Sequence, residues 1–90
     1  MFEDVHKQIE QTVRELEEKA EYGDAQAQYD LFVFLNAKAM EEYDISIFNR
    51  AEEMLKKSTI GGIQDAIETI NSQGVRRQVF MGRVERHEKT

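Results

Sequence analysis

The segment LEEKAEYGDAQAQYDLFVFL, residues 16–35, contains the signals that decide the fold. Gly23 follows a run of helix-forming residues, where the end of a helix favours a left-handed backbone conformation that glycine adopts at little steric cost. Asp24 comes next and can accept a hydrogen bond from the free amides at the start of a new helix. The segment therefore predicts two helices joined by a tight turn at Gly23 and Asp24.

The residues before this turn predict a first helix from about residue 3 to residue 21. Glu3 and Asp4 would lie in its first turn, where carboxylates complement the helix dipole. Because apolar residues recur at steps of three or four, one face of this helix should pack against the rest of the chain. These residues are Phe2, Val5, Ile9, Val13, Leu16 and Ala20.

The second helix is predicted from about residue 25 to residue 40. Within it, residues 31–35 (LFVFL) are apolar on every side of a helix. This segment should therefore be buried on more than one face, or should present a surface to a partner. Phe34 is expected to be its most secure core residue.

The signals for the next two helices are weaker. A third helix should begin at Asp44 or Ser46, either of which can act as an N-cap, and should end before the glycine pair at residues 61–62. A fourth should cover residues 63–72 and end at Gly74. Two helices joined by a tight turn, as in the first segment, are thus predicted to occur twice.

The C-terminal stretch is ambiguous between two structures. Residues 75–84 keep helical spacing but also allow a short strand, and Gly82 weakens both readings. We expect a short helix that ends before Glu85, followed by a frayed tail over residues 85–90. The predicted fold is all-α, with about four or five helices in antiparallel hairpins that form one domain over residues 1–84.

The composition supports a small helical domain. The chain has 90 residues, of which 40% are hydrophobic and 33% charged, and it has no proline. This is too apolar for a disordered chain. Because cysteine is absent, disulfides, thiolate metal sites and cysteine nucleophiles are excluded. The N-terminus does not resemble a signal peptide and no apolar run approaches a membrane span, which predicts a cytoplasmic protein.

The charge is distributed unevenly along the chain. Residues 1–74 contain 16 acidic and 7 basic side chains, a net charge of −9, whereas residues 75–90 contain 5 basic and 2 acidic side chains, a net charge of +3. The acidic part argues against nonspecific binding of nucleic acid, although a basic tail could make a few phosphate contacts. That tail contains Arg76, Arg77, Arg83 and Arg86. A solvated surface with a basic end is the alternative reading.

An internal repeat relates the two halves of the chain. Four pairs of matching residues lie 39 positions apart, which indicates a repeated pair of helices. The pairs are Leu16 and Leu55, Gly23 and Gly62, Ala27 and Ala66, and Leu31 and Ile70.

Residues 19–35 resemble the SEL-one-like repeat, a relative of the tetratricopeptide repeat. The matching residues are Ala20, Gly23, Asp24, Ala27, Gln28, Tyr29 and Leu31, and the second half of a unit is matched by Ala51, Leu55, Lys56, Lys57, Gly62 and Ala66. The resemblance covers residues 16–74, about one full unit flanked by half-units, and it implies a short α-solenoid. A generic four-helix bundle remains the alternative.

The chain departs from the family pattern at several positions. Phe32 stands where the family has a glycine that lets two helices cross closely, and Ala37 and Ala39 replace loop glycines. Ser58 and Thr59 replace a pair of alanines. Phe32 is therefore the first place to look for an unusual contact.

No catalytic or metal-binding pattern is found. His6 and His87 lie at opposite ends of the chain, and the adjacent glutamates at 17–18, 41–42 and 52–53 diverge around a helix instead of forming a dyad. No serine or threonine has a triad-type partner arrangement. We therefore expect neither an enzyme nor a cofactor, metal or small-molecule substrate.

The apolar surplus is the main indication of function. Roughly three helix-pair repeats are needed for independent stability, and this chain holds fewer, so something should cover the remaining face. Candidates are the first helix, the C-terminal segment, a second copy or another protein. Large side chains could anchor such a partner, although they could equally be ordinary core. These are Tyr29, Phe32, Tyr43 and Phe48.

The sequence therefore predicts a protein-interaction module, an adaptor or regulator that binds a partner or forms a homodimer. The alternative is an acidic inhibitor or immunity-type protein that binds a basic surface of a nuclease or nucleic-acid-binding enzyme. The acidic cluster that motivates it is Glu15, Glu17, Glu18, Glu21 and Asp24. Nucleic-acid binding through the arginine tail is a third, weaker hypothesis.

Overall fold

The computed structural model describes residues 2–89, and the side chains of all of these except residues 2–4 and 6. The predicted roles of Phe2, Glu3 and Asp4 lie outside the described side chains. Every element in the described range is an α-helix, which confirms the all-α class. The helices are α1 (Phe2–Glu21), α2 (Ala25–Glu42), α3 (Ile45–Ile60), α4 (Gln64–Ile70) and α5 (Gln73–Lys89).

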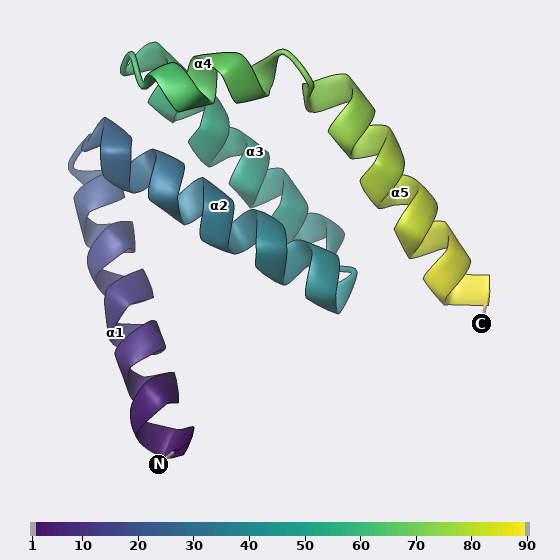
Figure 1. Cartoon of the computed structure of the whole chain (residues 1–90), viewed down its shortest axis with the longest axis horizontal. Coiled ribbons are helices and arrows are strands. Elements are labelled where there is room, and N and C mark those ends of the chain that lie inside the picture. The colour runs from purple at the N-terminus through teal and green to yellow at the C-terminus, as the bar shows by residue number, and fades with distance from the viewer. Residues whose placement is uncertain (1, 90) are drawn as a thin grey trace.

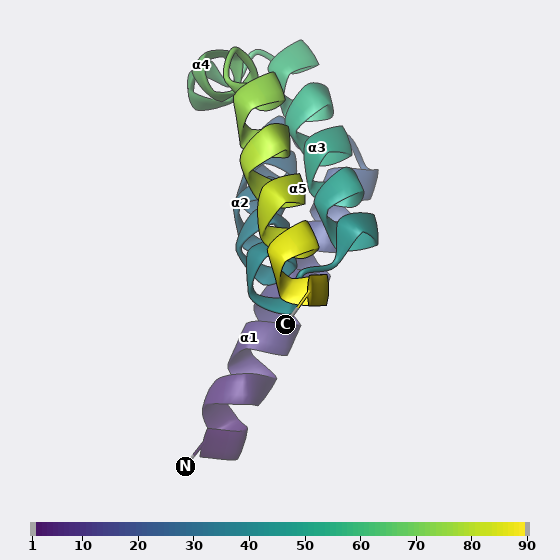
Figure 2. The ribbon, with the colours of Figure 1, turned by 90° about the vertical axis from the view of Figure 1, so that its right-hand side faces the viewer.

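The helices form a flat arrangement around a central antiparallel pair, α2 and α3. Figure 1 shows α1 at one edge of this pair, α5 at the other edge, and α4 across the end where α3 finishes. The extents of the chain are 39 × 39 × 17 Å, so one dimension is less than half of the other two. The N-terminal part of α1 extends beyond the other helices (Figure 2).

The turns after α1 and α3 have the same backbone geometry. Gly23 and Gly62 have φ angles of 91° and 86°, in the left-handed region. In both turns the glycine N–H donates to the carbonyl three residues back, and the next N–H donates to the carbonyl five residues back, over 3.0–3.1 Å. This is the hydrogen-bond pattern of a Schellman motif. The predicted turn at Gly23 is confirmed, and it recurs at Gly62.

Two aspartates cap the central helices. The Asp24 carboxylate accepts a hydrogen bond from the Ala27 amide at 3.0 Å, and the Asp44 carboxylate accepts one from the Ile47 amide at 3.1 Å. The structure thus selects Asp44 over Ser46 as the N-cap of α3. Tyr43, which precedes it, has a φ of 54° and is the one non-glycine residue in the described range with a positive φ.

The apolar side chains form two clusters. The larger one lies where α1, α2, α3 and α4 meet, and its buried members are Ala20, Leu31, Phe32, Leu35, Ala51, Met54, Leu55 and Ala66. The smaller one attaches α5 to the central pair through Ala39, Phe48, Phe80 and Val84. In it the rings of Phe48 and Phe80 stack with centroids 4.2 Å apart.

Three details of the C-terminal half differ from expectation. The fourth helix ends at Ile70 instead of at Gly74, because the chain turns at Asn71 and Gly74 lies in the first turn of α5. The predicted helix end before Glu85 is also wrong, since α5 continues to Lys89. Val84 is buried in the smaller cluster. This packing stabilises α5 at residue 84, where the helix was predicted to end. The proposed boundary at residue 84 therefore lies within a continuous helix.

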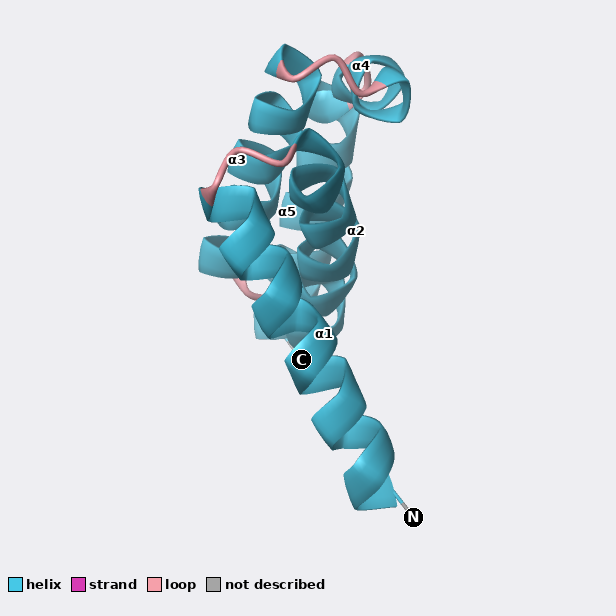
Figure 3. Ribbon diagram, turned by 90° about the vertical axis from the view of Figure 1, so that its left-hand side faces the viewer, coloured by secondary structure: helices cyan, strands magenta, loops and turns pink. Residues whose placement is uncertain are grey.

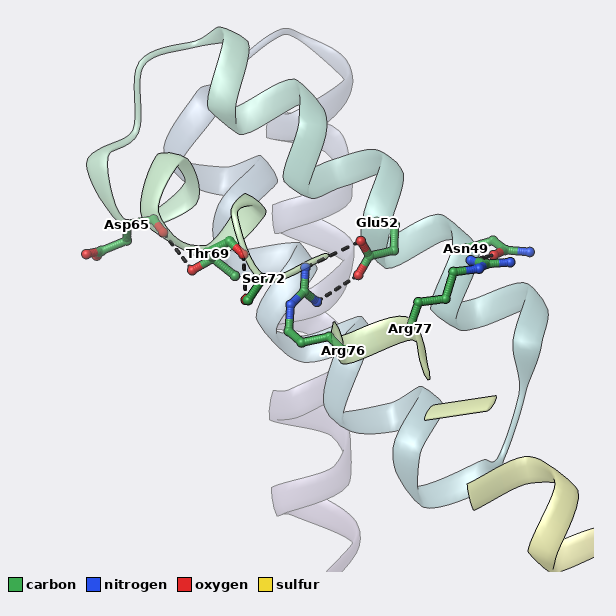
Figure 4. A network of polar contacts seen from close by, with 7 residues as sticks. All are labelled: Asn49, Glu52, Asp65, Thr69, Ser72, Arg76 and Arg77. Carbon is green, nitrogen blue, oxygen red and sulfur yellow. Dashed lines mark hydrogen bonds and ion pairs between the residues drawn. The ribbon is translucent and has the colours of Figure 1, made fainter. Parts of the chain in front are cut away.

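An ion pair joins the start of α5 to α3 (Figure 4). Arg76 Nη1 donates to Glu52 Oε1 at 2.7 Å, and Nη2 to Oε2 at 3.4 Å. The same guanidinium lies 5.3 Å from the centroid of the Phe32 ring. Arg77 donates to Asn49 at 3.0 Å. Because the Glu52 side chain is only 6% exposed, Arg76 supplies the counter-charge that its burial requires.

Removal of the Glu52 carboxylate tests the role of this ion pair. Glu52→Ala leaves Arg76 without its acidic partner, and we expect the free energy of unfolding to fall by about 2 kcal/mol. Glu53→Ala is the matched control, because Glu53 forms only an exposed pair with Lys57 and such pairs contribute about 0–1 kcal/mol. Urea unfolding followed by circular dichroism measures both. Equal losses would contradict a structural role for the ion pair.

The turn at Gly61 provides a second stability test. A Cβ at Gly61 would collide with the Cβ of Ala25 at the start of α2, whereas a Cβ at Gly82 would meet no atom within 4 Å. We expect Gly61→Ala to lower the free energy of unfolding by about 1–3 kcal/mol through overpacking. Gly82→Ala should raise it by up to about 1 kcal/mol through higher helix propensity. The same urea titration measures both changes in the free energy of unfolding, which should have opposite signs. An unchanged free energy of unfolding for Gly61→Ala would show that this turn is loosely packed.

Candidate protein-interaction groove

The four aromatic side chains predicted to anchor a partner lie mainly inside the fold. Phe32 and Phe48 are buried in the two apolar clusters. Tyr29 is half-buried, with its ring centroid 5.8 Å from that of Phe32. Tyr43 lies at the surface and stacks on His87 with centroids 4.0 Å apart. The prediction for Phe32 and Phe48 therefore needs correction, because α5 and the neighbouring helices already cover their rings.

The arginines of the predicted basic tail divide into two pairs. Arg76 and Arg77 are engaged with Glu52 and Asn49 of α3, so they hold α5 in place. Arg83 and Arg86 are exposed, and with Tyr43 and His87 they line a shallow hollow of about 280 Å³. Arg77 is also exposed, but of the four arginines only Arg83 and Arg86 form no side-chain hydrogen bond with α3 among the described residues.

An apolar hollow of the described surface lies between α1 and α2. One cavity of about 390 Å³ is lined by apolar residues that include Val5, Ile9, Val13, Leu16 and Phe34. An adjoining cavity of about 520 Å³ shares Ile9 and Phe34 and extends along α2 to Ala37 and Glu42. The two form one continuous open channel. We call it the α1–α2 groove, and its apolar floor consists of Val5, Ile9, Val13, Leu16, Phe34 and Ala37.

The groove exists because α1 diverges from α2 toward its N-terminus (Figure 3). Along the apolar stripe of α1, Ala20 is buried and Leu16 and Val13 are half-buried. Ile9 is 46% exposed and Val5 is 53% exposed. The stripe thus continues beyond the point where α2 can cover it. Val5 and Ile9 therefore share a helix face with core residues, yet lie open to solvent.

Phe34 contributes the α2 side of this groove. The sequence predicted it as the most secure core residue, but it is half-buried and lines the open channel. Its neighbours Leu31, Phe32 and Leu35 occupy the positions that face α1, α3 and the larger cluster. The sequence pattern could show that residues 31–35 are apolar all around, but could not show which side lacked a neighbour.

Charged side chains surround the apolar floor. The residues that line the groove and its edges include four acidic and two basic side chains, namely Glu10, Glu17, Glu41, Glu42, Arg14 and Lys38. Glu17 is paired with Arg50 at 2.9 Å. Among the side chains that the structure describes, Glu10, Glu41 and Glu42 form no ion pair. The rim therefore favours an apolar ligand that also carries positive charge.

The described residues show no group of three or more histidine, aspartate and glutamate side chains placed to hold a metal ion. The side chain of His6 is not among those described, so the structure does not test the prediction that His6 binds no metal. Within the described range, no helix has both the length and the hydropathy needed to cross a membrane. What the surface offers is apolar area with a charged rim, which suits binding of another polypeptide.

Known proteins do not supply a functional assignment. Comparison of the chain with protein-family models, with characterised proteins and with solved structures found no match. The functional argument therefore starts from the groove and the charges around it.

Proposed function

We propose that this chain is a small protein-interaction module, an adaptor or regulator, whose α1–α2 groove receives a helix from a partner protein or from a second subunit. The observation that carries this proposal is the exposure of Val5 and Ile9 in continuity with the buried part of the same stripe. Burial of such side chains contributes about 25 cal/mol for each Å² of apolar surface removed from water. A ligand that covers them gains that free energy.

A helix is the ligand that fits this groove best. The floor is formed by side chains from two helices that separate gradually, and an amphipathic helix can place its apolar side chains between them. A helix has a diameter of about 10–12 Å with its side chains, so it can contact α1 and α2 at once. Phe34 and Ile9, which line both cavities, would be the central contacts.

We also propose that the chain is a divergent SEL-one-like repeat and that its helices form a short α-solenoid. Support comes from the turns at Gly23 and Gly62, which lie 39 residues apart and share one hydrogen-bond pattern. Ala66 is fully buried, as the close packing of such a repeat requires. A solenoid with so few helices leaves apolar surface at its ends, which agrees with the open groove.

The remaining parts of the functional proposal follow the sequence analysis. We propose a cytoplasmic protein with no catalytic role, no cofactor and no small-molecule substrate. Nucleic-acid binding is a poor fit because two of the four tail arginines, Arg76 and Arg77, already bind groups of α3.

An acidic inhibitor or immunity-type protein remains the second candidate. Glu10, Glu15 and Glu18 lie along one exposed face of α1 and could contact a basic surface. Lys7 and Arg14 lie among them and reduce the local negative potential, and Asp24 caps α2. A partner bound through this face should dissociate as the salt concentration rises, and should be indifferent to changes in the apolar floor of the groove.

A capture experiment with matched variants tests the groove as the binding site. Ile9→Glu places a charge on the apolar floor, whereas Ile60→Glu places one on a side chain that is 87% exposed and outside the groove. We expect the wild-type chain and Ile60→Glu to retain the same partner from cells that express the protein, and Ile9→Glu to lose it, because burial of an unpaired charge is unfavourable. Quantitative mass spectrometry measures retention. Retention by Ile9→Glu would exclude the groove.

A further inference from the structure

The outer face of α5 is a second exposed apolar surface. Phe80 and Val84 are buried against α2 and α3, so the opposite side of α5 faces solvent. Val75 and Val79 lie there, four residues apart, and are 65% and 49% exposed. Gly82 and Arg86 continue the same face at helical spacing. We call this surface the α5 outer face.

The α5 outer face is long enough to lie along the floor of the α1–α2 groove. From residue 75 to residue 86 an α-helix rises about 16 Å, and it rises equally far from Val5 to Leu16 along the groove floor. The small side chains of the α5 outer face, two valines and one glycine, allow a close approach of α5 to Ile9 and Phe34. Large side chains on both surfaces would hold the helices apart.

The charges of the two surfaces are opposite. Glu10, Glu41 and Glu42 at the groove form no ion pair among the described side chains, and the same holds for Arg83 and Arg86 on α5. Arg14 and Lys38 at the groove reduce but do not cancel the acidic excess. Glu85 pairs with Lys89 at 3.2 Å, and with Glu88 counted as well α5 contains five Arg and Lys against two Glu. An acidic groove and a basic helix on the same chain are complementary.

The two surfaces cannot meet within one molecule. Figure 1 shows α1 and α5 at opposite edges of the central pair. The Arg76–Glu52 pair and the Phe48–Phe80 stack also fix α5 to α3. Any contact between the groove and α5 must therefore join separate copies of the chain.

From this complementarity we infer that the groove of one copy receives α5 of a second copy, so that the chain associates head to tail. The inference rests on the proposed function, because it names the occupant of the proposed groove. The interface is heterologous, since each copy contributes a different surface. Each associated pair keeps one groove and one α5 outer face free, and association can therefore continue into longer oligomers.

A complementation experiment tests this inference, with Ile9→Glu inactivating the groove and Val79→Glu inactivating the α5 outer face. In sedimentation equilibrium, the average mass of the wild-type chain should rise with concentration above the 10.5 kDa monomer, and less so at high salt. Each variant alone should associate at least about 10-fold more weakly. An equimolar mixture should form heterodimers, because Ile9→Glu retains α5 and Val79→Glu retains the groove.

Controls separate this inference from the proposed function. Ile60→Glu should associate like the wild type, and equal helical circular dichroism must show that all variants are folded. A wild-type chain that remains monomeric at every concentration and at low salt overturns head-to-tail association, as does a mixture that remains monomeric. The proposed function stands independently if a partner is still captured in an Ile9-dependent manner, and falls only if that capture also fails.

Discussion

The structure depends on the need to cover α2 on several sides. Its apolar residues point in every direction, so a single neighbouring helix cannot remove them from water. Leu31, Leu35 and Ala39 are buried among α1, α3 and α5, and each of those helices covers a different sector. The neighbours of α2 also hold one another, since the Arg76–Glu52 pair and the Phe48–Phe80 stack join α5 to α3.

The position of α5 depends on a polar contact placed beside an apolar one. Glu52 would be costly to bury alone, and Arg76 reaches it across the ring of Phe32. Phe32 also marks the departure from the repeat pattern that the sequence resembles. A glycine there would give the guanidinium no ring to lie against. Phe32 thus takes part in a specific contact between α2 and the C-terminal helix.

Local signals in the sequence predicted the local structure well. Gly23, Asp24 and Asp44 act within a few residues of their own positions, and the turn and caps they indicate are present. The composition of residues 31–35 likewise predicted burial on more than one face. Helix α5 was placed less accurately, because its extent depends on the burial of Val84 against distant residues.

The candidate site was predicted less well, for a physical reason. Sequence periodicity shows which residues share a helix face, but the distance over which two helices stay in contact is set by their crossing geometry. Ile9 and Ala20 belong to one stripe, yet only Ala20 is covered. Arg76 and Glu52 are 24 residues apart, so no local sequence pattern indicates their ion pair. For this reason Arg76 was assigned to a basic tail from the sequence.

The divergence of α1 from α2 also affects how stability is distributed. Val5 and Ile9, near the start of α1, are 53% and 46% exposed, and helical segments with so little burial unwind at a small fraction of the global unfolding free energy. A ligand bound between α1 and α2 favours only the conformations in which those turns are intact. Binding and folding are then linked, so the unfolding free energy of the isolated chain is a lower bound on its value when the groove is filled.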